Sequence, residues 1–290
     1  MRVDLPDVMC DPRAETAVAA ALAEDLGSGD ATTLALVDPD AVATGEILSR
    51  EACRVAGATV GRAVLKRVDP ALAVDVVAPD GSDVAPGQTI LSIRGRAASI
   101  LVAERTALNF MQRLCGIATL TSRFVEATRA FGTLILDTRK TTPNLRLFEK
   151  YAVACGGGTN HRFGLYDRVL IKDNHRRLWQ GGDPDRLDLA VLAARRAFPR
   201  LAVEVEVESL AECVSALRAQ PEWIMLDNMG CDLMRECVAL CKGVSKTEAS
   251  GGITLERARD VAATGVDAIS LGCLTHSAKA VDLSLEWSVV

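Results

Sequence analysis

Beyond residue 132 the chain alternates short apolar runs with amphipathic segments, a pattern typical of repeated strand and helix units. The apolar runs have strand length and are rich in β-branched residues, whereas the segments between them repeat apolar residues every three or four positions. We therefore predict strands at 134–136, 169–171, 203–207, 223–226, 244–248 and 268–271, with helices at 187–198, 210–219, 233–242 and 255–264. This alternation predicts a parallel sheet covered by helices.

The number of these units limits the fold. Ser209 and Glu212 have the spacing of a capping box at the start of one helix, and Gly265 follows the end of another. About 160 residues at roughly 25 per unit hold six or seven units, fewer than the eight of the common α/β barrel. We therefore expect an unusual or open α/β barrel.

The first third of the chain mixes helix signals with strand and turn signals. The Ala-rich stretch 14–26 is typical of a helix that stops at Gly27. Pro and Gly turn signals separate short β-branched runs, which lie at 45–49, 72–77 and 89–93. This part of the sequence predicts a small α+β sandwich.

A long helical segment separates these two patterns. Residues 98–131 carry apolar residues at helical spacing and predict one long helix or two consecutive helices, with a break at Gly116. The end of the chain has the pattern of a strand-like tail that returns to the first domain. We expect an N-terminal α+β sandwich domain at 1–115, joined by the tail 277–290, and a catalytic α/β barrel at 116–276.

Polar and glycine residues follow the predicted strands of the barrel, where each strand ends. They are Asp137-Thr138-Arg139-Lys140, Lys172-Asp173-Asn174-His175, Asp227-Asn228, Ser250-Gly251-Gly252 and Gly272. In parallel α/β folds ligands bind at the carboxyl ends of the strands, because the side chains and loops of several strands meet there. The sequence therefore predicts an active site at this edge of the barrel.

The strand at 203–207 supports this prediction. Because side chains alternate along a strand, its three valines face one way, and Glu204 and Glu206 face the other. In a barrel whose outer face is covered by helices, the valines point outward and the glutamates point inward. Acids inside a barrel need cations beside them, so we expect basic side chains or a divalent metal there.

The distribution of charge narrows the class of ligand. Residues 137–177 hold nine Lys and Arg and four Asp and Glu, a net +5, in a chain whose net charge is −5. A cationic island in an acidic protein favours a small polyanion, because nucleic-acid binding usually recruits a broad basic face. The aromatic content of 4% offers no stacking platform, so an RNA-binding module is a weak alternative.

Composition also bears on location and redox state. The chain has no apolar run of the ~18 residues that span a bilayer, and its N-terminus lacks a signal-peptide pattern, so we expect a cytoplasmic protein with no membrane partner. Its nine cysteines contain no CxxC pair and are expected to be reduced core residues. Cys237 and Cys241 share a helix face, but no nearby histidine supports a metal site there.

Several of the loops favour anionic groups. The turns at 250–252 and 270–272 each lie between a strand and a predicted helix, where backbone N–H groups and the helix dipole favour phosphate. His161 and Arg162 follow three glycines at 156–158, and with Arg139 and Lys140 they suit a pocket for carboxylates. The sequence contains neither a Walker A motif nor a GxGxxG fingerprint.

At this level of detail the chain resembles a known family. The stretches AERTALNFMQRLCGIAT, DTRKTTPNLR, KYAVACGGGTNHR, VLIKDNH, LDN, EASGGI and GVDAISLG are similar to the motifs of quinolinate phosphoribosyltransferase. The resemblance implies an N-terminal α/β sandwich and a seven-stranded α/β barrel. It also implies a homodimer, with sites shared across the interface, that makes nicotinate mononucleotide, pyrophosphate and CO₂ from quinolinate and phosphoribosyl pyrophosphate with Mg²⁺.

The resemblance also implies roles for individual residues. Arg139, His161 and Arg162 would hold the quinolinate carboxylates, with Arg105 reaching in from the partner subunit. Lys140 and Lys172 would contact phosphoribosyl pyrophosphate or bridge the two substrates, and Thr138 would also bind substrate. Glu206 and Asp227 would serve the ribose hydroxyls of phosphoribosyl pyrophosphate or Mg²⁺. The 5′-phosphate would be bound by two turns, which comprise Ser250, Gly251, Gly252, Leu271, Gly272 and Cys273.

Two departures and two further alternatives complete this interpretation. Asn144 stands where the family more often has Gly, and we expect the loop to survive because Asn tolerates a left-handed backbone. The stretch with Arg176, Arg177 and Trp179 has no assigned role. A paralogue of the same fold, of the molybdenum-transport-associated type, would use another substrate, and a Schiff-base enzyme would use Lys140 or Lys172.

Overall fold

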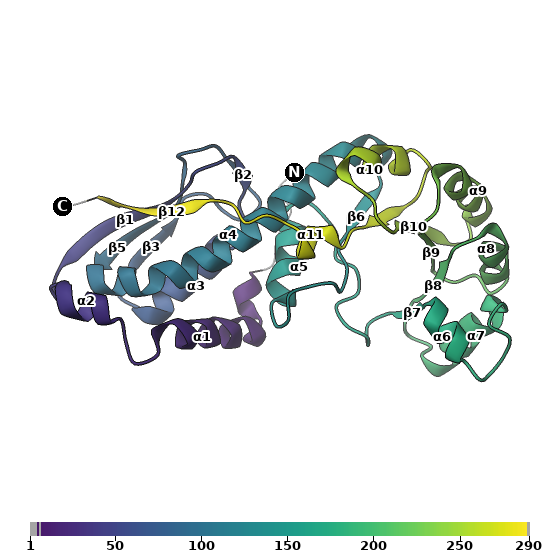
Figure 1. The fold of residues 1–290 in the computed structure, drawn as a ribbon, viewed down its shortest axis with the longest axis horizontal. Coiled ribbons are helices and arrows are strands. Elements are labelled where there is room, and N and C mark those ends of the chain that lie inside the picture. Colours follow the sequence, from purple (N-terminus) through teal and green to yellow (C-terminus); the bar gives the residue numbers. More distant parts are fainter. Residues whose placement is uncertain (1–4, 6, 289–290) are drawn as a thin grey trace. The chain divides into compact units, whose positions relative to one another are not determined.

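The computed structural model describes residue 5 and residues 7–288, and the chain divides into two compact units. The first unit comprises Met1–Ser122, Lys140–Gly158 and Cys273–Val290, and the second comprises Arg123–Arg139 and Thr159–Gly272. Residues 1–4 and 6 of the N-terminal stretch and residues 289–290 of the predicted tail lie outside the described residues. Figure 1 follows the chain by colour through both units.

An antiparallel sheet with the strand order β12-β1-β5-β3 forms the base of the first unit. Its strands are β1 Val42–Ser49, β3 Ala73–Val76, β5 Thr89–Arg96 and β12 Leu283–Ser288. The predicted tail supplies β12, which pairs with β1 along six residues from Leu283 opposite Ser49 to Ser288 opposite Thr44. A separate short pair joins β2 Cys53–Arg54 and β4 Asp83–Val84.

Helix α1 of the first unit begins after a capping side chain and ends at a glycine with positive φ. α1 Pro12–Leu26 starts after Asp11, whose carboxylate accepts the Arg13 amide, and stops at Gly27, where φ is +47°. The remaining helical elements of the unit are η1 Val8–Cys10, α2 Ala31–Leu36, α3 Ala58–Val68, α4 Ala97–Thr128, α5 Arg146–Cys155 and α11 Cys273–His276. α4 continues beyond Ser122 into the second unit.

Helix α4 is continuous over 32 residues, so the alternative of two helices with a break at Gly116 is wrong. A Cβ atom at Gly116 would lie 2.1 Å from the carbonyl oxygen of Lys279. The glycine therefore allows a close approach of two backbones and does not end the helix. Despite the length of α4, the described part of the chain contains no helix apolar enough to cross a membrane.

The second unit contains a parallel sheet with the strand order β6-β11-β10-β9-β8-β7. The strands are β6 Leu134–Leu136, β7 Val169–Ile171, β8 Val203–Val207, β9 Trp223–Asp227, β10 Lys246–Ser250 and β11 Ala268–Ser270. A parallel bridge between Thr159 and Leu136 adds a seventh position beside β6. The helical elements are η2 Arg129–Phe131, α6 Asp173–Leu178, α7 Leu187–Ala197, α8 Leu210–Leu217, α9 Cys231–Cys241 and α10 Leu255–Ala262.

The predicted fold class, an α+β sandwich followed by an α/β barrel, is confirmed. The predicted strands match the observed ones to within three residues: β1 begins three residues earlier and β5 ends three residues later than predicted, and β10 begins and ends two residues later. Ser209 caps α8, with its hydroxyl oxygen 3.2 Å from the Glu212 amide nitrogen. Glu212 accepts from the amide of Glu208 instead of Ser209, so only half of the predicted capping box forms.

Candidate active site

The carboxyl ends of the six parallel strands meet at one edge of the second unit. The register pairs Ser250 with Asp227 and Ser270 with Leu136, so the residues that follow neighbouring strands lie side by side. This edge therefore holds most of the predicted site residues, which are Thr138, Arg139, His161, Arg162, Lys172, Glu206, Asp227, Ser250, Gly251, Gly252, Leu271 and Gly272. The prediction that several strands contribute polar groups to one edge agrees with this arrangement.

Strand β8 carries two buried carboxylates that contact cations. Oε2 of Glu206 lies 2.5 Å from Nζ of Lys172, which directly follows β7. Oε2 of Glu204 lies 3.1 Å from Nη1 of Arg168 and 3.1 Å from Nε2 of His161, and Glu204 is fully buried. The expectation that inward-facing acids have cations beside them is therefore confirmed.

His161 is buried, and its two ring nitrogens have different surroundings. Nδ1 accepts a hydrogen bond of 2.7 Å from the Arg162 amide, while Nε2 lies 3.4 Å from Oε2 of Glu248, in addition to Glu204. The His161 amide itself donates to the buried Asp137 carboxylate at 2.8 Å. These contacts hold the His161–Arg162 peptide at the strand edge, and they turn the imidazole toward the interior acids.

The same contacts indicate which nitrogen of the His161 ring carries hydrogen. Burial lowers the pKa of His161 and the two carboxylates raise it, to about 9 in balance. A charged imidazole carries hydrogen on both nitrogens, however, and Nδ1 faces the hydrogen of the Arg162 amide. We therefore assign a neutral ring with its hydrogen on Nε2, and the proton of the cluster to Glu248, whose pKa is raised by burial and by Glu204.

Arg139 and Arg162 form the cationic part of the site. Burial and then the nearby charge of Arg139 lower the pKa of Arg162, and these effects outweigh Glu204 and Asp167, which raise it. Nη1 of Arg162 also donates to the carbonyl oxygen of Arg168 at 3.1 Å, which orients the guanidinium. Two guanidinium groups close enough to repel each other at a strand edge favour the binding of an anion between them.

The turn after β10 approaches the turn after β9. Gly251 has φ +97° and Gly252 has φ +56°, and a Cβ atom at Gly251 would lie 2.1 Å from Oδ1 of Asn228. The Asn228 amide also donates to the Ser250 carbonyl at 3.0 Å. α10 begins three residues after Gly252. The backbone of this turn therefore lies next to the N-terminus of a helix, which is the arrangement that binds phosphate.

Three predicted site residues belong to the first unit. Arg105 is exposed on α4, Lys140 is exposed in the loop after Arg139, and Cys273 is the first residue of α11. In the same loop Asn144 has φ +65°, so the left-handed conformation expected at this position is confirmed. Arg176, which had no assigned role, is buried and lies 2.9 Å from Glu212 in an ion pair between α6 and α8.

Two groups of residues at this edge have donors suited to a metal ion. His161, Glu204 and Glu248 bring three ligand atoms within 4.8 Å of one another, but Nε2 of His161 carries hydrogen and offers no lone pair. Glu206 and Asp227, on the neighbouring strands β8 and β9, provide the carboxylate oxygens that Mg²⁺ prefers, and Asp227 is partly exposed. The pair of Glu206 and Asp227 therefore fits Mg²⁺ better than the group of His161, Glu204 and Glu248.

Comparison with protein families identifies the fold. The family description "Quinolinate phosphoribosyl transferase, C-terminal domain" matches residues 117–286, and that of the N-terminal domain matches residues 30–115. The chain belongs to the quinolinate phosphoribosyltransferase family. The family resemblance seen in the sequence is therefore confirmed over both parts of the chain.

Individual relatives agree with this family assignment. The chloroplastic nicotinate-nucleotide pyrophosphorylase (carboxylating) of Oryza sativa subsp. japonica is 40% identical over 282 residues, 92% of this chain and 75% of that protein. A probable nicotinate-nucleotide pyrophosphorylase (carboxylating) of Bacillus subtilis is 40% identical over 263 residues, 91% of this chain and 89% of that protein. The solved nicotinate-nucleotide pyrophosphorylase of Francisella tularensis has a TM-score of 0.91 and 37% identity and covers 98% of each chain.

Sequence reasoning gave no site role to Arg168, Glu204 or Glu248, and it noted Asp137 only as a polar residue that follows a strand. Glu204 was recognised as inward-facing but was not counted in the site. The same alternation would have found Glu248, which lies two residues before Ser250 on β10 and hence on the same face. For Arg168 the sequence offers no signal, because its partner Glu204 lies 36 residues away.

Proposed function

We propose that this enzyme transfers the phosphoribosyl group of phosphoribosyl pyrophosphate to quinolinate, with loss of CO₂, to give nicotinate mononucleotide and pyrophosphate. The observation that carries the proposal is the pair of Arg139 and Arg162, close enough for the charge of Arg139 to lower the pKa of Arg162, at the strand edge of a barrel of this family. Such a site suits a planar dicarboxylate, because each guanidinium can bind one carboxylate through two parallel hydrogen bonds.

The two substrates are proposed to occupy adjoining parts of the strand edge. Arg139 and Arg162 bind the quinolinate carboxylates, with Arg105 of the partner subunit as a third cation. His161, whose Nε2 faces Glu204 and Glu248, contributes by holding Arg162. Its direct contact with a carboxylate stays a prediction. The 5′-phosphate of the second substrate is bound by the turns after β10 and β11, through Ser250, Gly251, Gly252, Leu271, Gly272 and Cys273.

The reaction needs charge stabilisation more than it needs a nucleophilic side chain. The bond from the ribose C1 to pyrophosphate breaks as the pyridine nitrogen approaches, so positive charge develops on the sugar and negative charge on the leaving group. Glu206 and Asp227 lie on neighbouring strands where they stabilise the sugar, and Lys140 and Lys172 neutralise the leaving group. The resulting pyridinium accepts the electron pair released when the 2-carboxylate departs as CO₂.

We propose Mg²⁺ as the metal that accompanies phosphoribosyl pyrophosphate, held by Glu206 and Asp227 directly or through water. When bound, this ion would neutralise charge on the pyrophosphate. The salt link of Glu206 to Lys172 at 2.5 Å would also help to hold both groups for the substrate. Glu206 and Lys172 both belong to the second unit, so this salt link requires no residue of the first unit.

The homodimer and the cytoplasmic location are part of the proposal. Arg105 is exposed on α4, as a residue that serves a partner subunit must be. Mixing Arg105→Ala with Arg139→Ala should partly restore activity, because a hybrid dimer then contains one site in which both arginines are intact. If mixed dimers form and no activity returns, each site is built from a single chain.

The proposed function is tested with purified protein, quinolinate, phosphoribosyl pyrophosphate and Mg²⁺, by following nicotinate mononucleotide and released CO₂. We expect both products in equal amounts, and far less product with nicotinate, which lacks the 2-carboxylate. Arg162→Lys keeps the charge but loses the bidentate geometry, so it should raise KM for quinolinate. Absence of product with quinolinate would favour the same-fold paralogue, and borohydride trapping of substrate on a lysine would favour the Schiff-base enzyme.

A further inference from the structure

A buried carboxylate in the first unit binds the loop that carries Lys140. Glu149 on α5 is fully buried, and its Oε1 lies 2.9 Å from Nη2 and 3.2 Å from Nε of Arg113 on α4. The same carboxylate accepts from the Thr142 hydroxyl at 2.8 Å and from the Thr142 amide at 3.1 Å. Four hydrogen bonds therefore converge on one buried anion, and two of them come from the loop.

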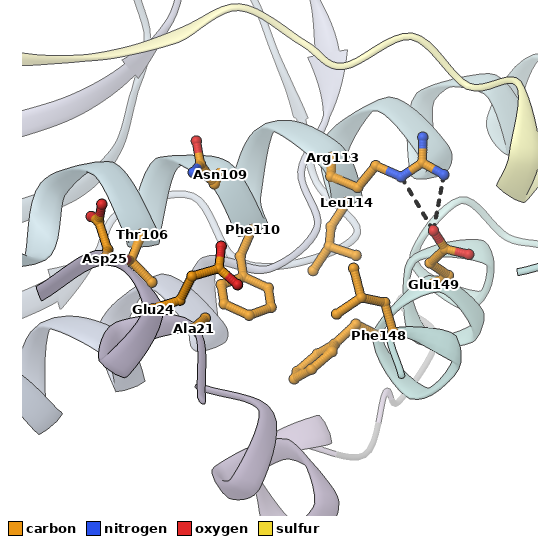
Figure 2. Close-up of a pocket in the computed structure, with 11 residues that line it drawn as sticks. Ala21, Glu24, Asp25, Thr106, Asn109, Phe110, Arg113, Leu114, Phe148 and Glu149 are labelled. Carbon is orange, nitrogen blue, oxygen red and sulfur yellow. Dashed lines mark hydrogen bonds and ion pairs between the residues drawn. The ribbon is translucent and has the colours of Figure 1, made fainter. Parts of the chain in front are cut away.

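Figure 2 shows the Arg113–Glu149 pair at the wall of a pocket of about 250 Å³ in the first unit. α1 and α4 supply most of the lining, and Phe148 and Glu149 come from α5. Phe148 packs against Phe110 with ring centroids 5.2 Å apart. These apolar contacts lie beside an ion pair in which Glu149 is fully buried and the Arg113 side chain is 27% exposed.

Thr275 on α11 holds the other end of the loop. Its hydroxyl donates to the carbonyl oxygen of Lys140 at 2.7 Å, and Thr275 is fully buried. The carbonyl oxygen of Thr275 accepts from Nη2 of Arg113, whose Nη1 donates to the Ala278 carbonyl at 3.0 Å. One guanidinium thus joins both contacts to the loop, on either side of Thr141.

The loop needs such contacts because it has no regular structure of its own. Residues 137–142 belong to neither a helix nor a strand, and two of their backbone groups, the Lys140 carbonyl and the Thr142 amide, are bonded by side chains. Each of these contacts is made by a buried or half-buried group whose own position is fixed by a helix. An exposed lysine on such a loop is therefore attached to a rigid backbone.

We propose that Arg113, Glu149 and Thr275 form a clamp that positions the backbone of Lys140–Thr142, and with it the Lys140 ammonium group, for phosphoribosyl pyrophosphate. The inference rests on the proposed function, in which Lys140 contacts that substrate. None of the three clamp residues touches substrate in this account, so they are positioning residues. A fixed backbone lowers the entropy that Lys140 loses when it binds the pyrophosphate group.

Thr275→Val is the most selective test, because valine keeps the shape of threonine and removes only the hydroxyl donor. We expect kcat/KM for phosphoribosyl pyrophosphate to fall roughly 3- to 10-fold, as the loss of one buried hydrogen bond implies. Thr275→Ser restores the donor and should recover most of the loss. Thr121→Val is the matched control: Thr121 is also fully buried in this unit, and its hydroxyl donates to the Ile117 carbonyl at 2.8 Å.

The control distinguishes a clamp from a merely structural contact. Both valine variants should lower the melting temperature, but only Thr275→Val should change kcat/KM. A double-mutant cycle with Lys140→Ala adds a second criterion, because a residue that acts through Lys140 has no further effect once that ammonium group is gone. The clamp is refuted if Thr275→Val has its full effect on kcat/KM in the Lys140→Ala background. It is also refuted if Thr275→Val lowers the melting temperature but leaves kcat/KM unchanged.

Hydrogen exchange separates this proposal from the proposed function. Without any substrate, the amides of residues 140–145 should exchange faster in Thr275→Val than in wild type, and Thr121→Val should leave them unchanged. If wild type gives no product from quinolinate, the proposed function fails, yet the exchange result still decides whether the loop is clamped. Unchanged exchange in Thr275→Val would overturn the clamp even in an active enzyme.

Discussion

Alanine at Gly251 should destabilise the second unit more than alanine at the adjacent Gly252. Both residues have positive φ, at +97° and +56°, so each substitution costs about 1–2 kcal/mol of backbone strain. Only at Gly251 would the new Cβ atom also lie 2.1 Å from Oδ1, 2.6 Å from Cγ and 2.9 Å from the amide nitrogen of Asn228. Overpacking of this kind costs a further ~1–3 kcal/mol.

The two variants control for each other. Both replace glycine by alanine, so the loss of chain entropy in the unfolded state is the same for each and cancels in the comparison. The difference of ~1–3 kcal/mol corresponds to a melting temperature lower by roughly 2–10 °C for Gly251→Ala, measured by calorimetry. Gly251→Ala should also raise KM for phosphoribosyl pyrophosphate more than Gly252→Ala does, since the proposed phosphate turn must move.

A second substitution identifies the clash as the cause. Asn228 itself has φ +53°, so Asn228→Gly is tolerated by the backbone and removes the two nearest contacts of the new Cβ atom. Combined with Gly251→Ala, it should recover part of the lost stability. Equal melting temperatures for the two alanine variants, or no coupling between positions 228 and 251, would refute this reasoning.

The acids of the barrel interior and the proposed metal lead to further predictions. Glu204→Gln should lower the free energy of unfolding by about 2 kcal/mol or more, because it leaves Arg168 without its buried partner. Glu248→Gln should lower it less, because Glu248 is assigned as protonated. Chemical denaturation of the two variants compares these losses. Chelation of divalent ions should abolish turnover and added Mg²⁺ should restore it, whereas activity that persists after chelation would remove the metal from the proposal. Asp227→Asn should weaken Mg²⁺ activation, measured as a higher Mg²⁺ concentration for half-maximal rate.

Local patterns in the sequence predicted the elements and the edge on which the site lies. The alternation of Val203–Val207 was sufficient to turn Glu204 and Glu206 inward, since a strand has a period of two residues. The sequence left a helix break at Gly116 as one of two alternatives, because a helix-breaking glycine and a glycine at a close backbone contact have the same local sequence. The contact that distinguishes them is made by Lys279, which lies far along the chain.

The partners of the site residues could not be predicted for the same reason. Arg113 and Thr275 contact each other although 162 residues separate them, and Arg168 reaches Glu204 across 36 residues. No spacing rule applies over such separations, because the pairing is decided by how strands and helices pack. The family resemblance supplied candidate substrate contacts, but it did not indicate which way the His161 ring faces.

The cations of the strand edge fall into two groups with different roles. Arg168 lies 3.1 Å from the fully buried carboxylate of Glu204, so its charge is largely balanced within the protein. Arg162 differs, because burial and Arg139 lower its pKa more than nearby acids raise it. Arg162 is half-buried, and a bound dianion would offset the cost of removing part of its charge from water. The interior acids therefore hold His161 and Arg168 in place, while Arg162 carries charge that a bound substrate anion would balance.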